Sequence, residues 1–293
     1  MTGFEAHMAE GATTVARAWA LRRTDGVELG FTDHDADLEF AGVRFRAGAG
    51  LSASALAHST GLAVDNTEAS GALCDSGLSE ADILAGRYDG AELRIWQVNW
   101  ADVAQRRLIF RGTLGEITRV GAAFRAELRG LAEALGQPQG RIYQPDCTAV
   151  LGDAQCRFDV TAPGFTALQP VETVEDRRVF RFAQLADFED RWFETGHLQV
   201  QDGPAAGLGG VIKNDRLAAD GARRIELWQA LAAPLRAGDT LRLIAGCDKR
   251  ASTCRLKFGN LVNFRGFPFI PGEDWLMAVP RSDGRNDGGS LAL

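Results

Sequence analysis

Four of the five cysteines form two close pairs, and no other feature of the sequence has chemistry as evident. Eight residues separate Cys147 from Cys156, and six separate Cys247 from Cys254. Four thiols on two short loops supply the ligand set of a tetrahedral zinc site or of an iron–sulfur cluster. Cys74 stands alone, and we interpret it as a small buried hydrophobic residue. The sequence therefore predicts a metal centre.

The spacing within each pair leaves the kind of metal open. Zinc knuckles usually place about two to four residues between cysteines, and ferredoxin runs are also tighter than eight and six. By spacing alone, separate structural thiols or two disulfides are supported as well as a shared metal site. Four cysteines with no histidine nearby in sequence fit zinc and an iron–sulfur cluster equally well. The four histidines all lie away from the cysteines in the chain: His7, His34, His58 and His197.

Cations surround the second pair. Between Gly246 and Arg265, five cations accompany a single anion, Asp248. Cations beside thiols favour the thiolate that binds metal, and they offset the negative charge of a four-thiolate cluster. Apart from the cysteines, a solvated basic loop explains the same residues equally well. The five cations are Lys249, Arg250, Arg255, Lys257 and Arg265.

Composition and charge narrow the class of protein. At 31.5 kDa, with 45% hydrophobic residues, the chain is long and apolar enough for two globular domains, and 34 glycines indicate many turns. A net charge of −7 argues against a general nucleic-acid binder, which needs a basic face. No apolar run approaches the roughly 18 residues of a membrane span, and we find no secretory signal. We therefore expect a cytoplasmic protein with reduced thiols, which weakens the disulfide alternative.

Alternating hydrophobic residues predict β-hairpins in the first half of the chain. Residues 19–24 and 27–32 flank an Asp25-Gly26 turn, and residues 37–46 alternate around a second turn at Ala41-Gly42. We expect further strands over 91–99, 107–120 and 122–128, and short helices over 79–85 and 129–135.

The second half repeats this pattern before the second cysteine pair. Short strands are predicted over 178–182, 197–200, 210–213, 224–228 and 240–244. The predicted fold class is mainly β, with two β-barrel or sandwich-like domains, few short helices and an irregular C-terminal tail. The predicted domains are 1–160, 161–245 and 246–293. Each β unit ends in a cysteine pair, so a site built from both pairs would connect the two units.

Other motifs give little support for catalysis. Asp33-His34-Asp35 resembles the opening of a calcium loop, but Leu38 and Arg44 occupy the positions that need glycine and glutamate. A polar hairpin corner explains this stretch better. The sequence contains no nucleophile elbow, no zinc-protease helix motif and no phosphate-binding loop. We therefore predict that the chain is not an enzyme.

Three stretches resemble one protein family. They are 246–275, 30–35 and 146–156, and the first is the most specific. The family comprises phage-type tail proteins of prophages and of gene transfer agents of alphaproteobacteria, and the resemblance runs over most of the chain. It implies a baseplate hub protein, similar to the minor tail protein at the tail tip of lambda-like phages. Such hubs are built from β-barrel domains and assemble as a homotrimer on the tail axis.

The resemblance also implies a cofactor. Hubs of this kind carry a [4Fe-4S] cluster on four cysteines, which correspond here to Cys147, Cys156, Cys247 and Cys254. Cys74 has no counterpart in the motif. The resemblance, unlike the spacing, therefore favours iron–sulfur over zinc. It implies a structural cluster that holds the hub together and does not carry electrons.

The same resemblance implies partners. These are the distal tail protein and the central tail-tip or fibre protein of the baseplate, with a tail-tip peptidase as a further partner. DNA would meet the hub only in transit, and no membrane anchor is expected. The hub would assemble in the cytoplasm and leave in a virion-like particle. Two other classes stay open: a zinc- or cysteine-dependent cell-wall hydrolase that uses Cys147 or Cys254, and a soluble iron–sulfur redox or sensor protein.

Overall fold

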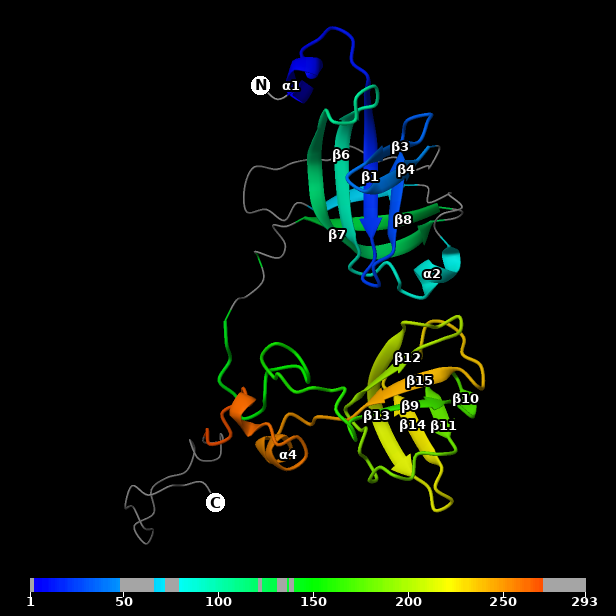
Figure 1. The fold of residues 1–293 in the computed structure, drawn as a ribbon, viewed down its shortest axis with the longest axis vertical. Coiled ribbons are helices and arrows are strands. Elements are labelled where there is room, and N and C mark those ends of the chain that lie inside the picture. Colours follow the sequence, from blue (N-terminus) through cyan, green and yellow to red (C-terminus); the bar gives the residue numbers. More distant parts are fainter. Residues whose placement is uncertain are drawn as a thin grey trace, which may run out of the picture. The chain divides into compact units, whose positions relative to one another are not determined.

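The computed structural model describes residues 3–47, 66–71, 79–120, 123–130, 136 and 140–270. The chain divides into two compact units, Met1–Gln139 and Gly140–Leu293. Each unit is built on one β-sheet, and the helices are short (Figure 1). The predicted mainly β fold class is therefore confirmed. No helix within the described ranges is long and apolar enough to cross a membrane.

An eight-stranded sheet forms the first unit, in the order β3-β4-β2-β1-β6-β7-β8-β5. Neighbouring strands pair antiparallel except β2 and β4, which run parallel. The elements are α1 (Gly3–Met8), β1 (Val15–Arg22), β2 (Glu28–Thr32), β3 (Leu38–Phe40), β4 (Val43–Arg46), β5 (Asn66–Gly71), α2 (Glu80–Leu84), β6 (Glu92–Asn99), β7 (Arg106–Val120) and β8 (Ala123–Gly130).

Both predicted hairpins of this unit are confirmed. β1 pairs with β2 so that Trp19 lies opposite Phe31, across the Asp25-Gly26 turn. In the β3–β4 hairpin, Ala41 and Gly42 have φ angles of 52° and 78°. A two-residue turn requires this left-handed conformation at both central positions, which glycine adopts without strain.

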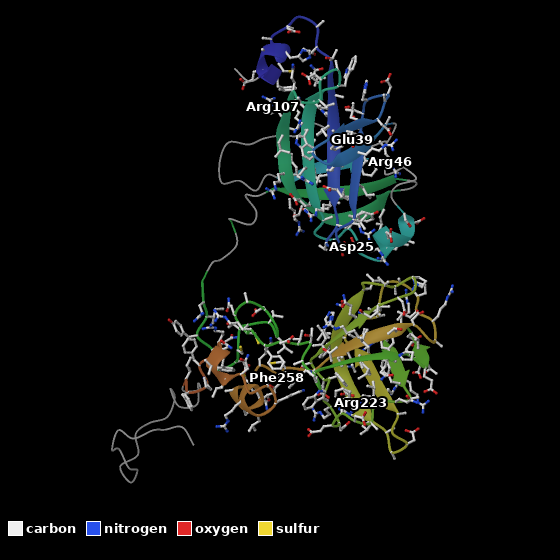
Figure 2. The ribbon with its side chains drawn as sticks, viewed as in Figure 1. Asp25, Glu39, Arg46, Arg107, Arg223 and Phe258 are labelled. Carbon is white, nitrogen blue, oxygen red and sulfur yellow. The ribbon has the colours of Figure 1, made fainter. Side chains whose placement is uncertain are left out.

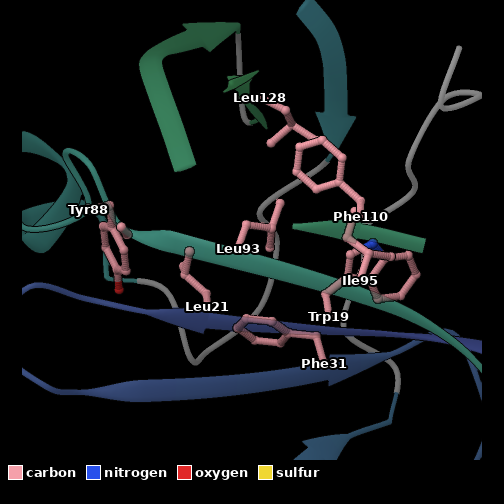
Figure 3. Packing of buried hydrophobic residues seen from close by; sticks show 9 residues of the cluster. Trp19, Leu21, Phe31, Tyr88, Leu93, Ile95, Phe110 and Leu128 are labelled. Carbon is pink, nitrogen blue, oxygen red and sulfur yellow. The ribbon is translucent and has the colours of Figure 1, made fainter. Parts of the chain in front are cut away.

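The sheet of the first unit is buried on both faces. On β1, Trp19 and Leu21 belong to one hydrophobic cluster, while Ala18 and Ala20 belong to the other. This division follows from the two-residue period of a strand, which sends successive side chains to opposite faces. The first cluster, drawn in Figure 3, consists of Trp19, Leu21, Phe31, Tyr88, Ala91, Leu93, Ile95, Phe110 and Leu128.

A seven-stranded antiparallel sheet forms the frame of the second unit, in the order β10-β11-β14-β13-β12-β15-β9. Alternate residues again enter the core, as do Leu198 and Val200 on β12 and Leu241 and Leu243 on β15. The elements are β9 (Thr166–Pro170), β10 (Thr173–Glu175), β11 (Val179–Phe182), β12 (His197–Val200), β13 (Gly209–Leu217), β14 (Arg223–Leu227), β15 (Thr240–Ile244), α4 (Ala251–Leu256) and the 3-10 helix η1 (Leu261–Asn263).

A buried ion pair lies in this second core. Asp215 of β13 and Arg223 of β14 are both 0% exposed, and Arg223 Nη1 donates to Asp215 Oδ2 over 3.0 Å. Figure 2 labels Arg223. The carboxylate also accepts the N–H of Phe193 (2.8 Å), whose ring lies against the guanidinium. Because an unpaired buried charge is costly, each member of the pair requires the other.

Some elements differ from the predicted ones. The helix predicted over 79–85 is present as α2, but residues 129 and 130 end strand β8, and 131–135 lie outside the described residues. The sequence did not predict α1, β5, β9, β10 or α4, because short segments with weak propensity form only with the support of contacts elsewhere in the fold. Of the predicted irregular tail, residues 258–270 contain η1, and 271–293 lie outside the described part. The structure has two compact units, Met1–Gln139 and Gly140–Leu293. The predicted division into the three domains 1–160, 161–245 and 246–293 stays a prediction.

Candidate metal centre

Two segments of the second unit that lie about 100 residues apart in sequence run side by side. They are residues 140–160 and 246–270, together called the cysteine module here and drawn in green and in orange in Figure 1. The backbone N–H of Cys147 donates to the carbonyl oxygen of Lys249 (2.9 Å), and Lys249 Nζ donates to that of Ala149 (2.5 Å). These bonds hold the first cysteine loop against the second.

The same two segments also meet at Gly266. The N–H of Phe267 donates to the carbonyl oxygen of Gln144 (2.9 Å), and the rings of Phe267 and Tyr143 lie 4.7 Å apart. A Cβ atom on residue 266 would lie 2.5 Å from the carbonyl oxygen of Pro145. Only glycine therefore permits this close approach of the two backbones.

The four paired cysteines line one pocket of the module. All four thiols are free; Cys254 is buried, and Cys147, Cys156 and Cys247 are half-buried. About 340 Å³ among the lining residues is free of protein atoms, part of it open to solvent. The structure thus brings together the four cysteines that the sequence singled out. Cys74 lies outside the described residues.

The location of the pocket corrects one expectation. The sequence predicts that a site built from both cysteine pairs connects two β units, yet all four cysteines belong to the second compact unit. Residues 140–160 pack against the second cysteine loop, and none of them belongs to a strand of the first sheet. A bound metal would therefore join two segments within one unit.

Asp153 shapes the loop that presents Cys156. Its carboxylate accepts the N–H groups of Val150 (2.9 Å), Gln155 (2.9 Å) and Cys156 (2.6 Å). These backbone donors, that of Cys156 first, lower the pKa of Asp153, because they stabilise its charged form. A side chain three residues earlier thus fixes the backbone of the cysteine, as in other turns built on aspartate.

Asp248 has the corresponding role in the second loop. Its Oδ1 accepts the N–H of Arg250 (3.0 Å), and its Oδ2 accepts the hydroxyl of Thr253 (2.9 Å). These bonds stabilise the start of helix α4, which begins at Ala251, four residues after Cys247. Cys254 lies within this helix and is only 8% exposed, so the helix sets the direction of the fourth thiol.

Three of the four thiols accept N–H hydrogen bonds. The backbone N–H of Arg265 lies 3.4 Å from Cys147 Sγ, and that of Lys249 donates to the thiol of Cys247. The side-chain amide nitrogen of Asn260 lies 3.5 Å from Cys156 Sγ. Donors of this kind stabilise thiolates and orient them toward a metal. The donor set therefore fits a thiolate-bound centre.

Burial sets the acidity of the metal-free thiols. It raises the pKa of Cys254 to about 11, and the negative charges of Cys247, Cys147 and Cys156 add to the shift. Burial also raises the pKa of Cys247, against the effect of the Lys249 N–H. These two thiols are consequently protonated at neutral pH, and a metal must displace their protons on binding.

The separation of the ligands bears on the kind of metal. Within the described residues, no three Cys, His, Asp or Glu side chains lie close enough together to hold a single metal ion. Around one zinc ion the four sulfurs would lie about 3.8 Å apart, because tetrahedral Zn–S bonds are about 2.3 Å long. In this structure the described thiols therefore do not form a preformed site for one ion.

The charge of the module also suits an anionic centre. Its two segments contain seven cations and four anions in a chain of net charge −7. None of these seven cations forms an ion pair within the described part of the chain, whereas arginines of both sheets commonly do. They are Arg141, Arg157, Lys249, Arg250, Arg255, Lys257 and Arg265. These charges are available to offset the negative charge of four thiolates.

Sequence reasoning missed two residues of the site. Asn260 lies six positions after Cys254, yet its side chain contacts Cys156 on the other segment of the module. No local sequence pattern reveals such a contact. Lys257 stood out only as one cation among five, but its ammonium is turned inward onto Trp192. Burial lowers the pKa of Lys257 to about 8. Only the tertiary fold separates this lysine from its exposed neighbours.

Comparison with known proteins finds two matching family models and a similar solved structure. Residues 1–159 match the family model described as "Baseplate hub protein, N-terminal attachment domain", and residues 191–274 match "Phage conserved hypothetical protein BR0599". No curated protein matches. A solved structure described as "Virion of native gene transfer agent (GTA) particle" contains a chain with 59% identity and a TM-score of 0.91, covering 99% of this chain and 100% of that one. The β-rich fold and these matches agree with the resemblance seen in the sequence, and the chain belongs to the family of phage baseplate hub proteins.

Proposed function

We propose that the chain is a structural component of the tail baseplate of a gene transfer agent or prophage particle. Its membership in the hub family and its full-length similarity to a chain of a gene transfer agent virion support this function. Its role is to join parts of the tail and not to catalyse a reaction.

The proposed cofactor is a [4Fe-4S] cluster. One observation carries this proposal: four free thiols, from two segments about 100 residues apart, line a single pocket. The N–H donors at the sulfurs and the surrounding cations support a centre with net negative charge. The proposed ligands are Cys147, Cys156, Cys247 and Cys254.

The cluster would stabilise a module that has little core of its own. The module contains one six-residue helix and the three residues of η1. Large hydrophobic side chains in it remain exposed, among them Ile142 (74%), Val262 (95%) and Phe269 (80%). Small segments that cannot bury enough apolar surface commonly depend on a metal or disulfide. When bound, the cluster supplies metal–thiolate bonds that hold the two segments together.

The finer assembly is also part of the proposal. The hub forms a homotrimer on the tail axis, next to the distal tail protein and the central tail-tip or fibre protein, with a tail-tip peptidase as a further partner. It assembles in the cytoplasm and then belongs to the baseplate of the released particle. The net charge of −7 suits the wall of a DNA conduit, because like charge keeps DNA from adhering in transit.

Anaerobic purification, an absorption spectrum, and quantification of iron, acid-labile sulfide and zinc test the cofactor. About four irons and four sulfides per chain, with absorption near about 400 nm, are expected. One zinc per chain would retain a structural metal and refute the cluster. No metal would refute both. Negative-stain electron microscopy of the purified protein tests the ring-shaped oligomer.

A cell-wall hydrolase receives no specific support from the site. A nucleophilic cysteine needs a lowered pKa, whereas burial raises the pKa of Cys254, one of the two candidate nucleophiles. Histidine is not among the described residues that line the pocket. Peptidoglycan cleavage that is lost on Cys254→Ser would contradict the structural function.

A further inference from the structure

The hydrogen bonds to the thiols come from two kinds of donor. Cys147 and Cys247 receive backbone N–H groups, which are present whatever side chain the donor residue carries. Cys156 receives the side-chain amide of Asn260, which exists only because residue 260 is asparagine. Among the described residues of the module, Asn260 is therefore the position where side-chain chemistry controls a hydrogen bond to the sulfur of a proposed ligand.

Contacts on every side hold Asn260 in one orientation. Its Nδ2 donates to the carbonyl oxygen of Cys156 (2.7 Å) and approaches Cys156 Sγ (3.5 Å). Its Oδ1 accepts the side-chain amide of Asn263 (2.7 Å), and its backbone N–H donates to the carbonyl oxygen of Cys254 (3.0 Å). Because Oδ1 accepts from Asn263, the NH₂ group faces Cys156.

The position of Asn260 links two ligands on different segments. Its backbone N–H donates to the carbonyl oxygen of Cys254, within helix α4, while its side chain reaches the Cys156 loop. Asp153 holds the same loop from its other side, through the N–H of Cys156. The Cys156 residue is thus fixed by two side chains, one from each segment.

We propose that Asn260 is a positioning residue of the metal centre: its amide N–H directs the Cys156 sulfur into the pocket and stabilises negative charge on it. This inference rests on the proposed cluster. N–H donors at cluster sulfurs raise the reduction potential, because reduction adds negative charge that the donor stabilises. Residues that orient ligands from outside also slow the loss of metal.

The test uses the full chain, reconstituted anaerobically with iron and sulfide, as wild type and as Asn260→Asp, Asn260→Ala and Asn263→Ala. Asn260→Asp keeps the size and the acceptor oxygen but replaces the donor with a negative charge. We expect both Asn260 variants to lose iron to a chelator about tenfold faster than wild type. Their reduction potentials, followed by electron paramagnetic resonance, should be more negative, with Asn260→Asp the more affected. Asn263→Ala keeps the amide donor of Asn260 and removes only the hydrogen bond that Asn263 donates to Asn260 Oδ1. We therefore expect a rate of iron loss and a potential between those of wild type and the Asn260 variants.

The outcomes separate this inference from the proposed cofactor. Wild-type protein without iron and sulfide would refute the cluster itself. Wild-type protein with a cluster, and Asn260→Asp with the same potential and the same rate of iron loss, would overturn the role of Asn260 alone. A change in thermal unfolding of the metal-free variants, with an unchanged potential of the loaded protein, would mean a purely structural role and would also overturn the inference.

Discussion

Lys257, the residue directly after helix α4, and Trp192, in the turn before β12, connect the cysteine module to the rest of the second unit. The Lys257 ammonium donates to the carbonyl oxygen of Trp192 over 2.6 Å and lies 4.2 Å from the centroid of its ring. It also donates to the carbonyl oxygen of Gly246, directly before the second cysteine pair (3.0 Å). One side chain therefore fixes the helix that carries Cys254 and the end of the strand that leads to Cys247.

Lys257→Met should destabilise the second unit. The change removes two charge-assisted hydrogen bonds and a cation–π contact, so we expect a loss of about 2–4 kcal/mol in the free energy of unfolding. Arg255→Met is the matched control, because Arg255 is a cation two residues earlier, exposed in helix α4. Urea denaturation measures both. Equal stability of the two variants would show that the link to Trp192 is unimportant.

Replacing a proposed ligand should lower both the iron content and the stability of the protein. We expect Cys147→Ser and Cys254→Ser to contain less iron than wild type and to unfold at lower temperature. A ligand bound at about a thousand times its Kd stabilises the folded state by about 4 kcal/mol, which sets the expected scale. Cys74→Ser, outside both pairs, should keep its iron. Iron content and calorimetry are the measurements; full iron in Cys254→Ser would remove it from the ligand set.

Gly266→Ala should separate the two segments of the module. The new methyl group would lie 2.5 Å from the carbonyl oxygen of Pro145, and backbone atoms cannot rotate away as a side chain can. Overpacking of this kind typically costs about 1–3 kcal/mol. Gly11→Ala, where a Cβ meets nothing within 4 Å, serves as the control. Faster loss of iron and a lower unfolding temperature are expected only for Gly266→Ala.

The buried pair in the second sheet should respond asymmetrically to mutation. Asp215→Ala leaves the guanidinium of Arg223 buried without its counterion, so a loss of about 3–5 kcal/mol is expected. The double change Asp215→Leu with Arg223→Met removes both charges and should be milder. Chemical denaturation of the single and double variants measures the difference. A double variant that is less stable than Asp215→Ala would contradict this account.

The stability of the second unit should fall in acid partly through Glu226. Hydrogen bonds from Asn214 and Lys213 hold the pKa of the Glu226 carboxyl below its ordinary value of 4.5. A carboxylate with a depressed folded-state pKa contributes stability above its unfolded pKa and loses it as pH falls through the folded pKa. Glu226→Gln should therefore flatten the decline in unfolding free energy below pH 4.5. Parallel pH profiles of the two proteins would refute this role.

Local pattern was enough to predict the hairpins and the mainly β class. The β1–β2 and β3–β4 turns each contain a glycine in the left-handed conformation, Gly26 and Gly42, and apolar residues alternate on the flanking strands. Strands β9 and β10 were not predicted, because they form through pairing with β15 and β11 and their own composition does not favour a strand. The helix α4 depends on contacts of Asp248 within a loop that reads as merely basic.

The candidate site divides in the same way. Cysteine type and spacing by themselves determined which four residues could bind a metal, because thiols in close pairs are rare and chemically specific. The tertiary structure decided that both pairs meet in one pocket of the second unit, and that Asn260 and Lys257 complete its surroundings. Contacts between residues about 100 positions apart arise from packing and backbone hydrogen bonds, which leave no trace in local sequence pattern.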